Sequence, residues 1–130
     1  MKKETRIKVW NKYNKRCAYC GKEIEYKDMQ VDHFVPQRIF DNYKNKLNTE
    51  ENIKLFKEQF NVESIDKDDL SNLMPSCRRC NHYKRDYLPE NFRKNMQSLH
   101  ERLEKIYIFK VALDHGIVNI NPFKKFYYED

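Results

Sequence analysis

The sequence predicts an α+β fold, in which a β-hairpin and a short helix form a small core and further helices surround it. Three observations lead to this prediction. Two Cys-x-x-Cys pairs stand far apart, at residues 17–20 and 77–80. Residues 22–35 have the pattern of a hairpin, and other stretches space their apolar residues as amphipathic helices do. A chain of 130 residues is expected to form one domain.

The composition is polar and basic. Hydrophobic residues make up 39% of the chain and charged residues 35%, so the core is modest and a bound metal would help to stabilise it. Residues 1–40 hold ten basic and five acidic residues, residues 41–70 hold five and eight, and residues 71–130 hold eleven and seven. The net charge of +6 suits a polyanion such as nucleic acid, although an ordinary solvated surface has a similar composition. We expect a polyanion to approach the two basic segments, which carry the Cys pairs.

Neither a signal peptide nor a membrane span is expected. The first six residues, Met-Lys-Lys-Glu-Thr-Arg, are not followed by an apolar run. The apolar runs elsewhere are only a few residues long, too short to cross a bilayer. We therefore expect a cytoplasmic protein, in which paired cysteines bind metal and do not form disulfides.

The N-terminal part is expected to form a helix and then a metal-binding turn. Residues 2–16 combine many basic residues with an apolar stripe. The stripe consists of Ile7, Val9, Trp10 and Tyr13. Cys17-Ala-Tyr-Cys20-Gly21 follows as a tight turn, in which two thiolates can bind one ion and Gly21 supplies backbone freedom.

Residues 22–35 are expected to form the hairpin, with a turn at Lys27-Asp28 and a second strand that ends before Pro36. Strict alternation along this strand directs Asp32 and His33 to opposite faces. A bulge or a strand end would therefore be needed to bring both side chains to one site.

Residues 38–70 are expected to form a helical insert that packs against the core. One helix should begin at Asn48 or Thr49, because acidic residues follow these capping residues. Ser64 and the acidic residues after it resemble a second helix start. We assign the core itself to about residues 6–36 and 71–88.

A short helix is expected around Cys80 and through Lys84, followed by a long C-terminal helix. Leu88-Pro89 should open the long helix, and Gly116 should end it. Its apolar residues recur at spacings of four and three. The aromatic-rich end of the C-terminal segment, 89–130, is expected to fold back on the domain.

Four cysteines, Cys17, Cys20, Cys77 and Cys80, would give Zn²⁺ a closed tetrahedral site, and a saturated site of this kind is structural. The two pairs are separated by 56 residues, so the ion would join distant segments. Unpaired buried thiols are the alternative. A redox Cys-x-x-Cys fits poorly, because there are two copies and neither lies in a βαβ pattern.

Asp32 and His33 are a second group of candidate functional residues. Phosphodiester hydrolysis needs an activated water and a stabilised leaving oxygen. An ordinary histidine titrates near pH ~6.5 and can accept a proton from water. A hard divalent ion prefers oxygen ligands, which Asp32 and the side-chain carbonyl of Asn81 can provide.

As an ordered set, these residues resemble the HNH endonucleases of the ββα-metal type. The matching motifs are Cys17-x-x-Cys20, Asp32-His33-x-x-Pro36, Asn72-Leu73, Cys77-x-x-Cys80-Asn81 and Lys84. The segment Asp-His-Phe-Val-Pro-Gln is also similar to the corresponding strand in the HNH domain of RNA-guided CRISPR nucleases. The resemblance covers residues 6–36 and 71–85.

The resemblance implies a nuclease, that is, a hydrolase of phosphodiester bonds that acts on double-stranded DNA. His33 would be the general base, and Asp32 and Asn81 would bind a catalytic ion such as Mg²⁺. Asn72 would hold the loop that carries His33, and the four cysteines would bind structural Zn²⁺. The residues expected to face phosphates are Lys84, Arg78, Arg79 and Arg85.

Two departures from the family pattern leave alternatives open. Asn81 stands where many members have His, and His82 follows it directly; on a helix His82 would point about 100° away, which favours Asn81 as the ligand. The frequent Gly-Gly after the proline is absent. A non-catalytic, zinc-stapled module that binds nucleic acid is one alternative, and a protein-interaction module that uses the acidic insert and aromatic tail is another. A partner subunit or a homodimer is possible, and the sequence does not say which, if either, forms.

Overall fold

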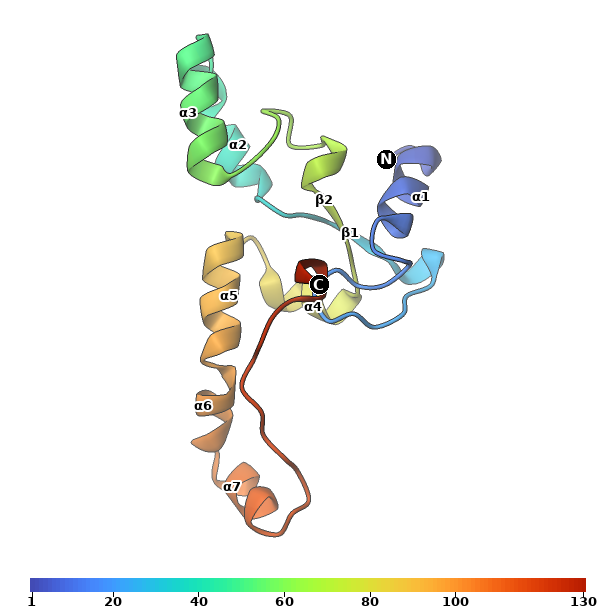
Figure 1. The fold of residues 1–130 in the computed structure, drawn as a ribbon, viewed down its shortest axis with the longest axis vertical. Helices are drawn as coiled ribbons and strands as arrows, with labels where there is room; N and C mark the ends of the chain where they lie inside the picture. The colour runs from blue at the N-terminus through green and yellow to red at the C-terminus, as the bar shows by residue number, and fades with distance from the viewer. The chain divides into compact units, whose positions relative to one another are not determined.

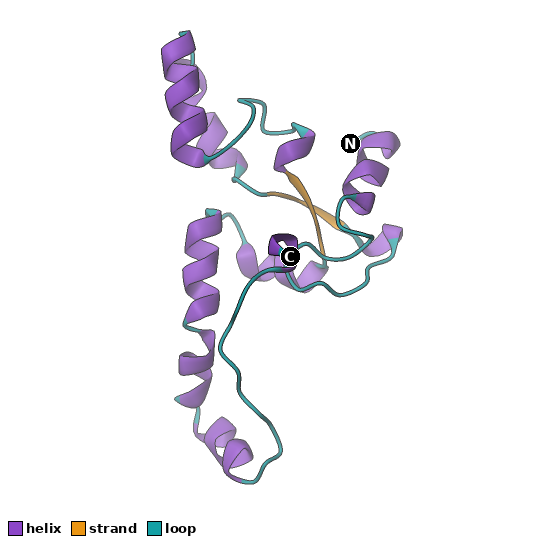
Figure 2. Cartoon of the chain, viewed as in Figure 1, coloured by secondary structure: helices purple, strands orange, loops and turns teal.

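A computed structural model describes all 130 residues, which form helices and one two-stranded antiparallel sheet (Figure 1 and Figure 2). The α+β class is therefore confirmed. The residues group into two compact units: Met1–Leu88 together with Phe126–Asp130, and Pro89–Lys125. None of the helices has the length and apolar character needed to cross a membrane.

The sheet pairs two segments that are distant in the sequence. Strand β1, Gln30–His33, runs antiparallel to strand β2, Leu73–Ser76, with Asp32 opposite Met74. The prediction of a hairpin within residues 22–35 is wrong, because Tyr26–Asp28 forms a 3₁₀ turn. The chain before this turn is mostly exposed, whereas every residue of β2 is buried, so pairing with β2 removes more surface from water.

Helix α1 spans Lys3–Asn11 and is shorter than predicted. Asn14 and Lys15 adopt φ angles of 59° and 63°, which an α-helix does not permit. This left-handed turn redirects the chain into the loop that holds the first Cys pair.

Side chains of α1 and of Lys12, which caps its C-terminus, hold the segments next to both strands. The Arg6 guanidinium donates to the carbonyls of Tyr26 and Met29, each at 2.7 Å. The Lys12 ammonium donates to the carbonyl of Leu73 at 2.9 Å. Part-buried carbonyls before β1 and at the start of β2 are thereby satisfied from one helix and its C-terminal cap.

The insert contains two α-helices, α2 at Gln37–Tyr43 and α3 at Glu50–Phe60. The predicted cap is confirmed at Thr49, whose side chain accepts a hydrogen bond from the amide of Asn52. The helix start predicted at Ser64 is wrong: its hydroxyl accepts from the amide of residue 66 within a turn, and only a 3₁₀ turn, Leu70–Asn72, follows.

An aromatic cluster forms the core of the insert. The Phe56 ring lies 5.4 Å from the rings of both Phe40 and Tyr43 and 5.0 Å from that of Phe60, measured between centroids. Phe56 is only 2% exposed. Val35, two residues after the end of β1, belongs to the same cluster, so the insert packs close to the end of that strand.

Helix α4, Arg78–Lys84, is the short helix that was predicted to run through Lys84. Cys77 caps it, because its sulfur accepts a hydrogen bond from the amide of Cys80 at 3.4 Å. Helix α4 contacts β1 and carries the second Cys pair on its first turn.

The second unit contains three helices where one long helix was predicted, so that prediction is wrong. They are α5 at Pro89–Gln97, α6 at Leu99–Glu104 and α7 at Tyr107–Asp114. At the first break the Ser98 hydroxyl donates to the carbonyl of Asn95, and the Arg102 guanidinium reaches the same carbonyl at 2.7 Å. These side chains bind backbone groups that would otherwise continue the helix.

The C-terminal tail returns to the first unit, as predicted. The amides of Tyr127 and Tyr128 donate to the carbonyls of Tyr19 and Ala18, at 3.0 and 2.7 Å. Gly21 has a φ of 77°, and a Cβ atom there would lie 2.9 Å from the Tyr127 ring. The tail therefore covers the loop that holds the first Cys pair.

The aromatic cluster predicts a stability difference between two neighbouring residues of α3. Phe56→Ala should lower the free energy of unfolding by about 3–5 kcal/mol, because it leaves a cavity among three rings. Leu55→Ala is the matched control, since Leu55 is 54% exposed, and should change stability by no more than about 0.5 kcal/mol. Urea denaturation followed by circular dichroism measures both values. Equal effects of the two substitutions would contradict the packing described.

Candidate metal centre and the polar groups beside it

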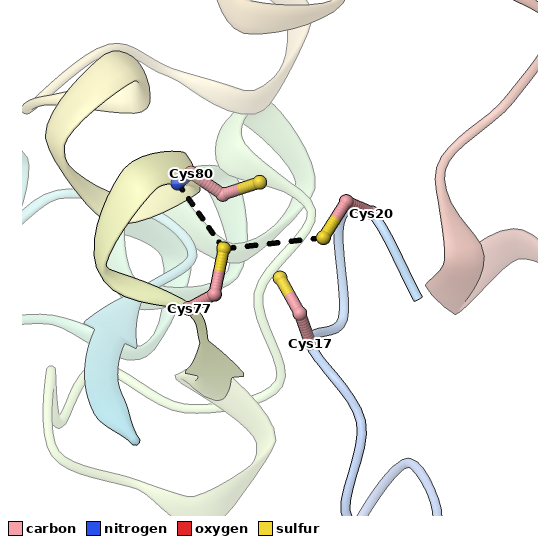
Figure 3. Close-up of side chains that lie close together, drawn as sticks. All are labelled: Cys17, Cys20, Cys77 and Cys80. Atoms are coloured by element: carbon pink, nitrogen blue, oxygen red, sulfur yellow. Dashed lines mark hydrogen bonds between the residues drawn. The ribbon is translucent and has the colours of Figure 1, made fainter. Parts of the chain in front are cut away.

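Four cysteine side chains converge from two distant parts of the chain (Figure 3). Cys17 and Cys20 belong to the loop after α1, and Cys77 and Cys80 belong to the start of α4. Their sulfur atoms all lie within 4.8 Å of one another, and those of Cys20 and Cys77 are 3.9 Å apart.

These distances fit a metal centre and not disulfides. A tetrahedral ion with bonds of about 2.3 Å to sulfur separates the sulfurs by about 3.8 Å. A disulfide would bring two of them to about 2.05 Å, and all four cysteines are free. The cluster can therefore hold a metal ion such as zinc, as the spacing of the cysteines predicted.

The loop around the first pair is shaped by backbone hydrogen bonds. The Cys17 amide donates to the carbonyl of Lys22 at 2.8 Å, and the Gly21 amide donates to that of Cys17 at 2.9 Å. The Ala18 amide donates to Pro75 of β2 at 2.8 Å. The loop is thus joined directly to the strand that leads to the second pair.

The electrostatics of the cluster favour a thiolate. The hydrogen bond from Cys80 lowers the pKa of Cys17 to about 4, and burial opposes this shift only in part. The same contact, aided by burial, raises the pKa of Cys80. Thiolates are the form of cysteine that binds metal. Binding of an ion to the cluster would therefore release the protons of the remaining thiols.

Asp32 is a buried carboxylate beside this cluster. The residue is 7% exposed, and its Oδ2 atom accepts hydrogen bonds from the Tyr19 hydroxyl and from the Lys84 ammonium, the latter at 3.0 Å. Burial raises the pKa of Asp32, and the positive charge of Lys84 opposes that shift. Burial, followed by the charge of Asp32, raises the pKa of Tyr19 well above its ordinary value, so the phenol stays protonated and donates.

Lys84 is completely buried, which corrects the prediction that it faces phosphates. Its ammonium donates to the carbonyl of His33 at 3.1 Å as well as to Asp32. Burial of an ammonium requires such partners, and these partners turn the side chain inward. The other three basic residues of this group, Arg78, Arg79 and Arg85, are exposed.

His33 is the last residue of β1, and its side chain points away from that of Asp32, as alternation predicted. Its Nε2 atom lies 2.8 Å from a carboxylate oxygen of Asp68. Its Nδ1 atom lies 3.4 Å from Nε2, the side-chain amide nitrogen of Gln37. The imidazole is 18% exposed, so solvent reaches it.

Asn72 makes the contacts that a loop-holding residue requires. Its side-chain oxygen accepts from the Val35 amide at 2.9 Å, and its side-chain nitrogen donates to the Val35 carbonyl at 3.1 Å. Its own carbonyl accepts from the amide of Phe34. The two residues after His33 are therefore fixed to Asn72.

Asn81 and His82 differ in their surroundings. Asn81 is half-buried, and it precedes Lys84 by three residues, so both occupy the face of α4 that meets β1. His82 is exposed. Asn81 therefore faces β1, whereas His82 is open to solvent.

Sequence reasoning missed two residues of this region. Tyr19 lies between the cysteines of the first pair, and nothing in the pattern indicated that its hydroxyl reaches Asp32. Asp68 is one of several carboxylates in the acidic stretch before Asn72, and its contact with His33 depends on how that stretch folds.

Comparison with known proteins adds no relative, because no family model, curated protein or solved structure matches the chain. Any functional assignment therefore depends on the residues and contacts described above.

Removal of the metal should unfold the first unit. A structural zinc site contributes about 10–16 kcal/mol of apparent folding free energy, which is comparable with the whole stability of a small domain. Purified protein should contain one zinc per chain by elemental analysis, and a strong chelator should abolish its cooperative melting. Addition of zinc to the stripped protein is the control and should restore the melt. Cys77→Ser that binds zinc and melts like the unmodified protein would contradict the four-cysteine site.

Proposed function

We propose that this protein is a metal-dependent endonuclease of the HNH type that cleaves DNA. The observation that supports the proposal most is the meeting of β1 with α4. Asp32 and His33 are the last two residues of β1, and Asn81 lies on α4, the helix that contacts this strand. In this proposal β1, β2 and α4 form the ββα-metal unit, and the cysteine cluster closes it.

His33 acts as the general base in this proposal. Asp68 accepts a hydrogen bond from Nε2–H, which leaves the lone pair on Nδ1. The contact of 3.4 Å from the Gln37 amide nitrogen to Nδ1 agrees with an acceptor at that atom. In this proposal the attacking water takes the place of the Gln37 side-chain amide at Nδ1 and passes its proton to that atom, and Asp68 stabilises the imidazolium that results.

Asp32 and Asn81 are the residues that would hold a divalent ion such as Mg²⁺. Both offer oxygen, the donor that hard ions prefer. When bound, such an ion neutralises charge on the phosphate and on the leaving oxygen. Tyr19 and Lys84 both bond to Oδ2 of Asp32, so Oδ1 is the atom that we expect to bind the ion.

Asn72 and Lys84 position the reacting groups. Asn72 binds both backbone groups of Val35 and so fixes the chain that follows His33. Lys84 binds the carbonyl of His33 itself. The segment that carries the base is thereby held by Asn72, directly before β2, and by Lys84 of α4.

The exposed guanidinium groups of α4 supply the contact with DNA. Arg78 and Arg79 lie on its first turn and Arg85 directly follows it, and all three side chains reach solvent. Such groups bind phosphates without regard to sequence.

A module that binds nucleic acid without cutting it is the second candidate. One observation favours it: the charge of Asp32 is already compensated by Lys84. A carboxylate compensated in this way attracts a cation less strongly than an unpaired carboxylate does.

Cleavage of plasmid DNA should depend on His33 and not on His82. His33→Ala should lower the rate by about 100- to 10,000-fold, because general-base catalysis supplies a factor of that size. His82→Ala is the matched control and should cut like the unmodified protein. Agarose gels with Mg²⁺ and Mn²⁺ measure both and also distinguish nicked from linear product. Binding without cleavage in every divalent metal would select the second candidate.

Binding to DNA should depend on the arginines of α4. A double substitution, Arg78→Ala with Arg79→Ala, should reduce the slope of log affinity against log salt by about 1.8, because two phosphate contacts are lost. Lys44→Ala with Lys54→Ala removes two exposed charges from the insert and should leave the slope unchanged. Fluorescence anisotropy at several salt concentrations gives the slopes. Equal slopes for the two double variants would place the DNA contact elsewhere.

A further inference from the structure

We propose that Tyr19 is a positioning residue for the divalent-ion site, and that it connects the cysteine cluster to the carboxylate of Asp32. The cluster would then orient a ligand of the second ion as well as stabilise the fold. This inference rests on the proposed function in one respect, namely that Asp32 binds a divalent ion.

The backbone of Tyr19 is held by its neighbours on both sides. Cys17 and Cys20 flank the Ala18-Tyr19 dipeptide, so an ion bound to the cluster fixes both ends of this short segment. The carbonyl of Tyr19 accepts from the Tyr127 amide at 3.0 Å. Between them, the cluster and the C-terminal tail leave the backbone of residue 19 little freedom.

The ring of Tyr19 is held as well. It packs edge-to-face on Phe126 and on Tyr128, with centroids 5.8 and 6.1 Å apart. The residue is 4% exposed. A phenol ring fixed by two perpendicular neighbours points its hydroxyl in one direction, and in this structure the hydroxyl donates to Oδ2 of Asp32.

This hydrogen bond helps to set the orientation of the Asp32 carboxylate. Tyr19 reaches Oδ2 from the loop, and Lys84 reaches the same atom from α4. Two donors on one oxygen fix the rotation of the carboxylate and turn Oδ1 towards another ligand. Without the hydroxyl, the carboxylate can rotate towards the Lys84 ammonium and offer it both oxygens. Hydrogen-bond partners of metal ligands act in this way in known metal sites.

The variant that tests the inference is Tyr19→Phe, which keeps the ring and removes only the hydroxyl. Mn²⁺ serves as the probe, because its binding to zinc-loaded protein can be followed by the electron paramagnetic resonance of the free ion. Tyr19→Phe should weaken Mn²⁺ binding by about 10- to 100-fold, with the zinc content unchanged. The Mn²⁺ concentration for half-maximal cleavage should rise by the same factor, while the KM for DNA stays constant.

Two control variants give the limits of the Mn²⁺ affinity, one with unchanged binding and one with none. Tyr43→Phe removes a hydroxyl from the aromatic cluster of the insert and should leave Mn²⁺ binding unchanged. Asp32→Asn should abolish Mn²⁺ binding, because it removes the ligand itself.

The outcomes separate this inference from the function on which it rests. Unmodified protein that neither binds Mn²⁺ nor cuts DNA would overturn the proposed function and this inference together. Unmodified protein that binds Mn²⁺ no more tightly than Tyr19→Phe does would overturn the inference alone. Loss of zinc from Tyr19→Phe would also overturn it, since the hydroxyl would then serve the cysteine loop and not the second ion.

Discussion

The convergence of four thiolates is the constraint on which the first unit depends. Cys20 and Cys77 are 57 positions apart, and closing a loop of this length costs about 4 kcal/mol of chain entropy by the relation used for disulfides. The sheet that joins these distant segments has only two strands of four residues, and such a pair is marginal by itself. An ion bound at the cluster would offset that cost. The β1–β2 pairing and the contact of α4 with β1 can then form around it.

The buried polar groups beside the cluster are not explained by stability. An ion pair such as that of Asp32 with Lys84 loses much hydration energy on burial, and apolar residues of similar size commonly stabilise a core as well or better. Here the pair is buried where α4 meets β1, next to the end of that strand. The two donors on one carboxylate oxygen hold Asp32 in a defined orientation, as its proposed role as a metal ligand requires.

Sequence reasoning succeeded where the chemistry was local or encoded in spacing. The two Cys pairs predicted the cluster, and the residues before and after Thr49 predicted the start of α3. Sequence reasoning failed where a segment pairs with another that is distant in the sequence. Ile24 and Tyr26 alternate as a strand would, but the buried partner of β1 comes from residues 73–76. It failed again at Ser98, because the apolar spacing continues through the break and only side-chain bonds to the backbone interrupt the helix. The inward turn of Lys84 depends on tertiary contacts that no spacing encodes.

The cysteine cluster is connected to Asp32 through two side chains, one from the loop and one from α4. Both donate to the same carboxylate oxygen. On the loop side, Tyr19 lies between Cys17 and Cys20 and donates to Oδ2 of Asp32. On the helix side, Lys84 follows Cys80 by four residues, so both lie on one face of α4, and Lys84 donates to the same oxygen. Any shift of one half of the cluster against the other would pull the two donors apart. The geometry of the carboxylate is therefore tied to closure of the cluster, and a fold with little hydrophobic core can hold a buried polar group in one orientation.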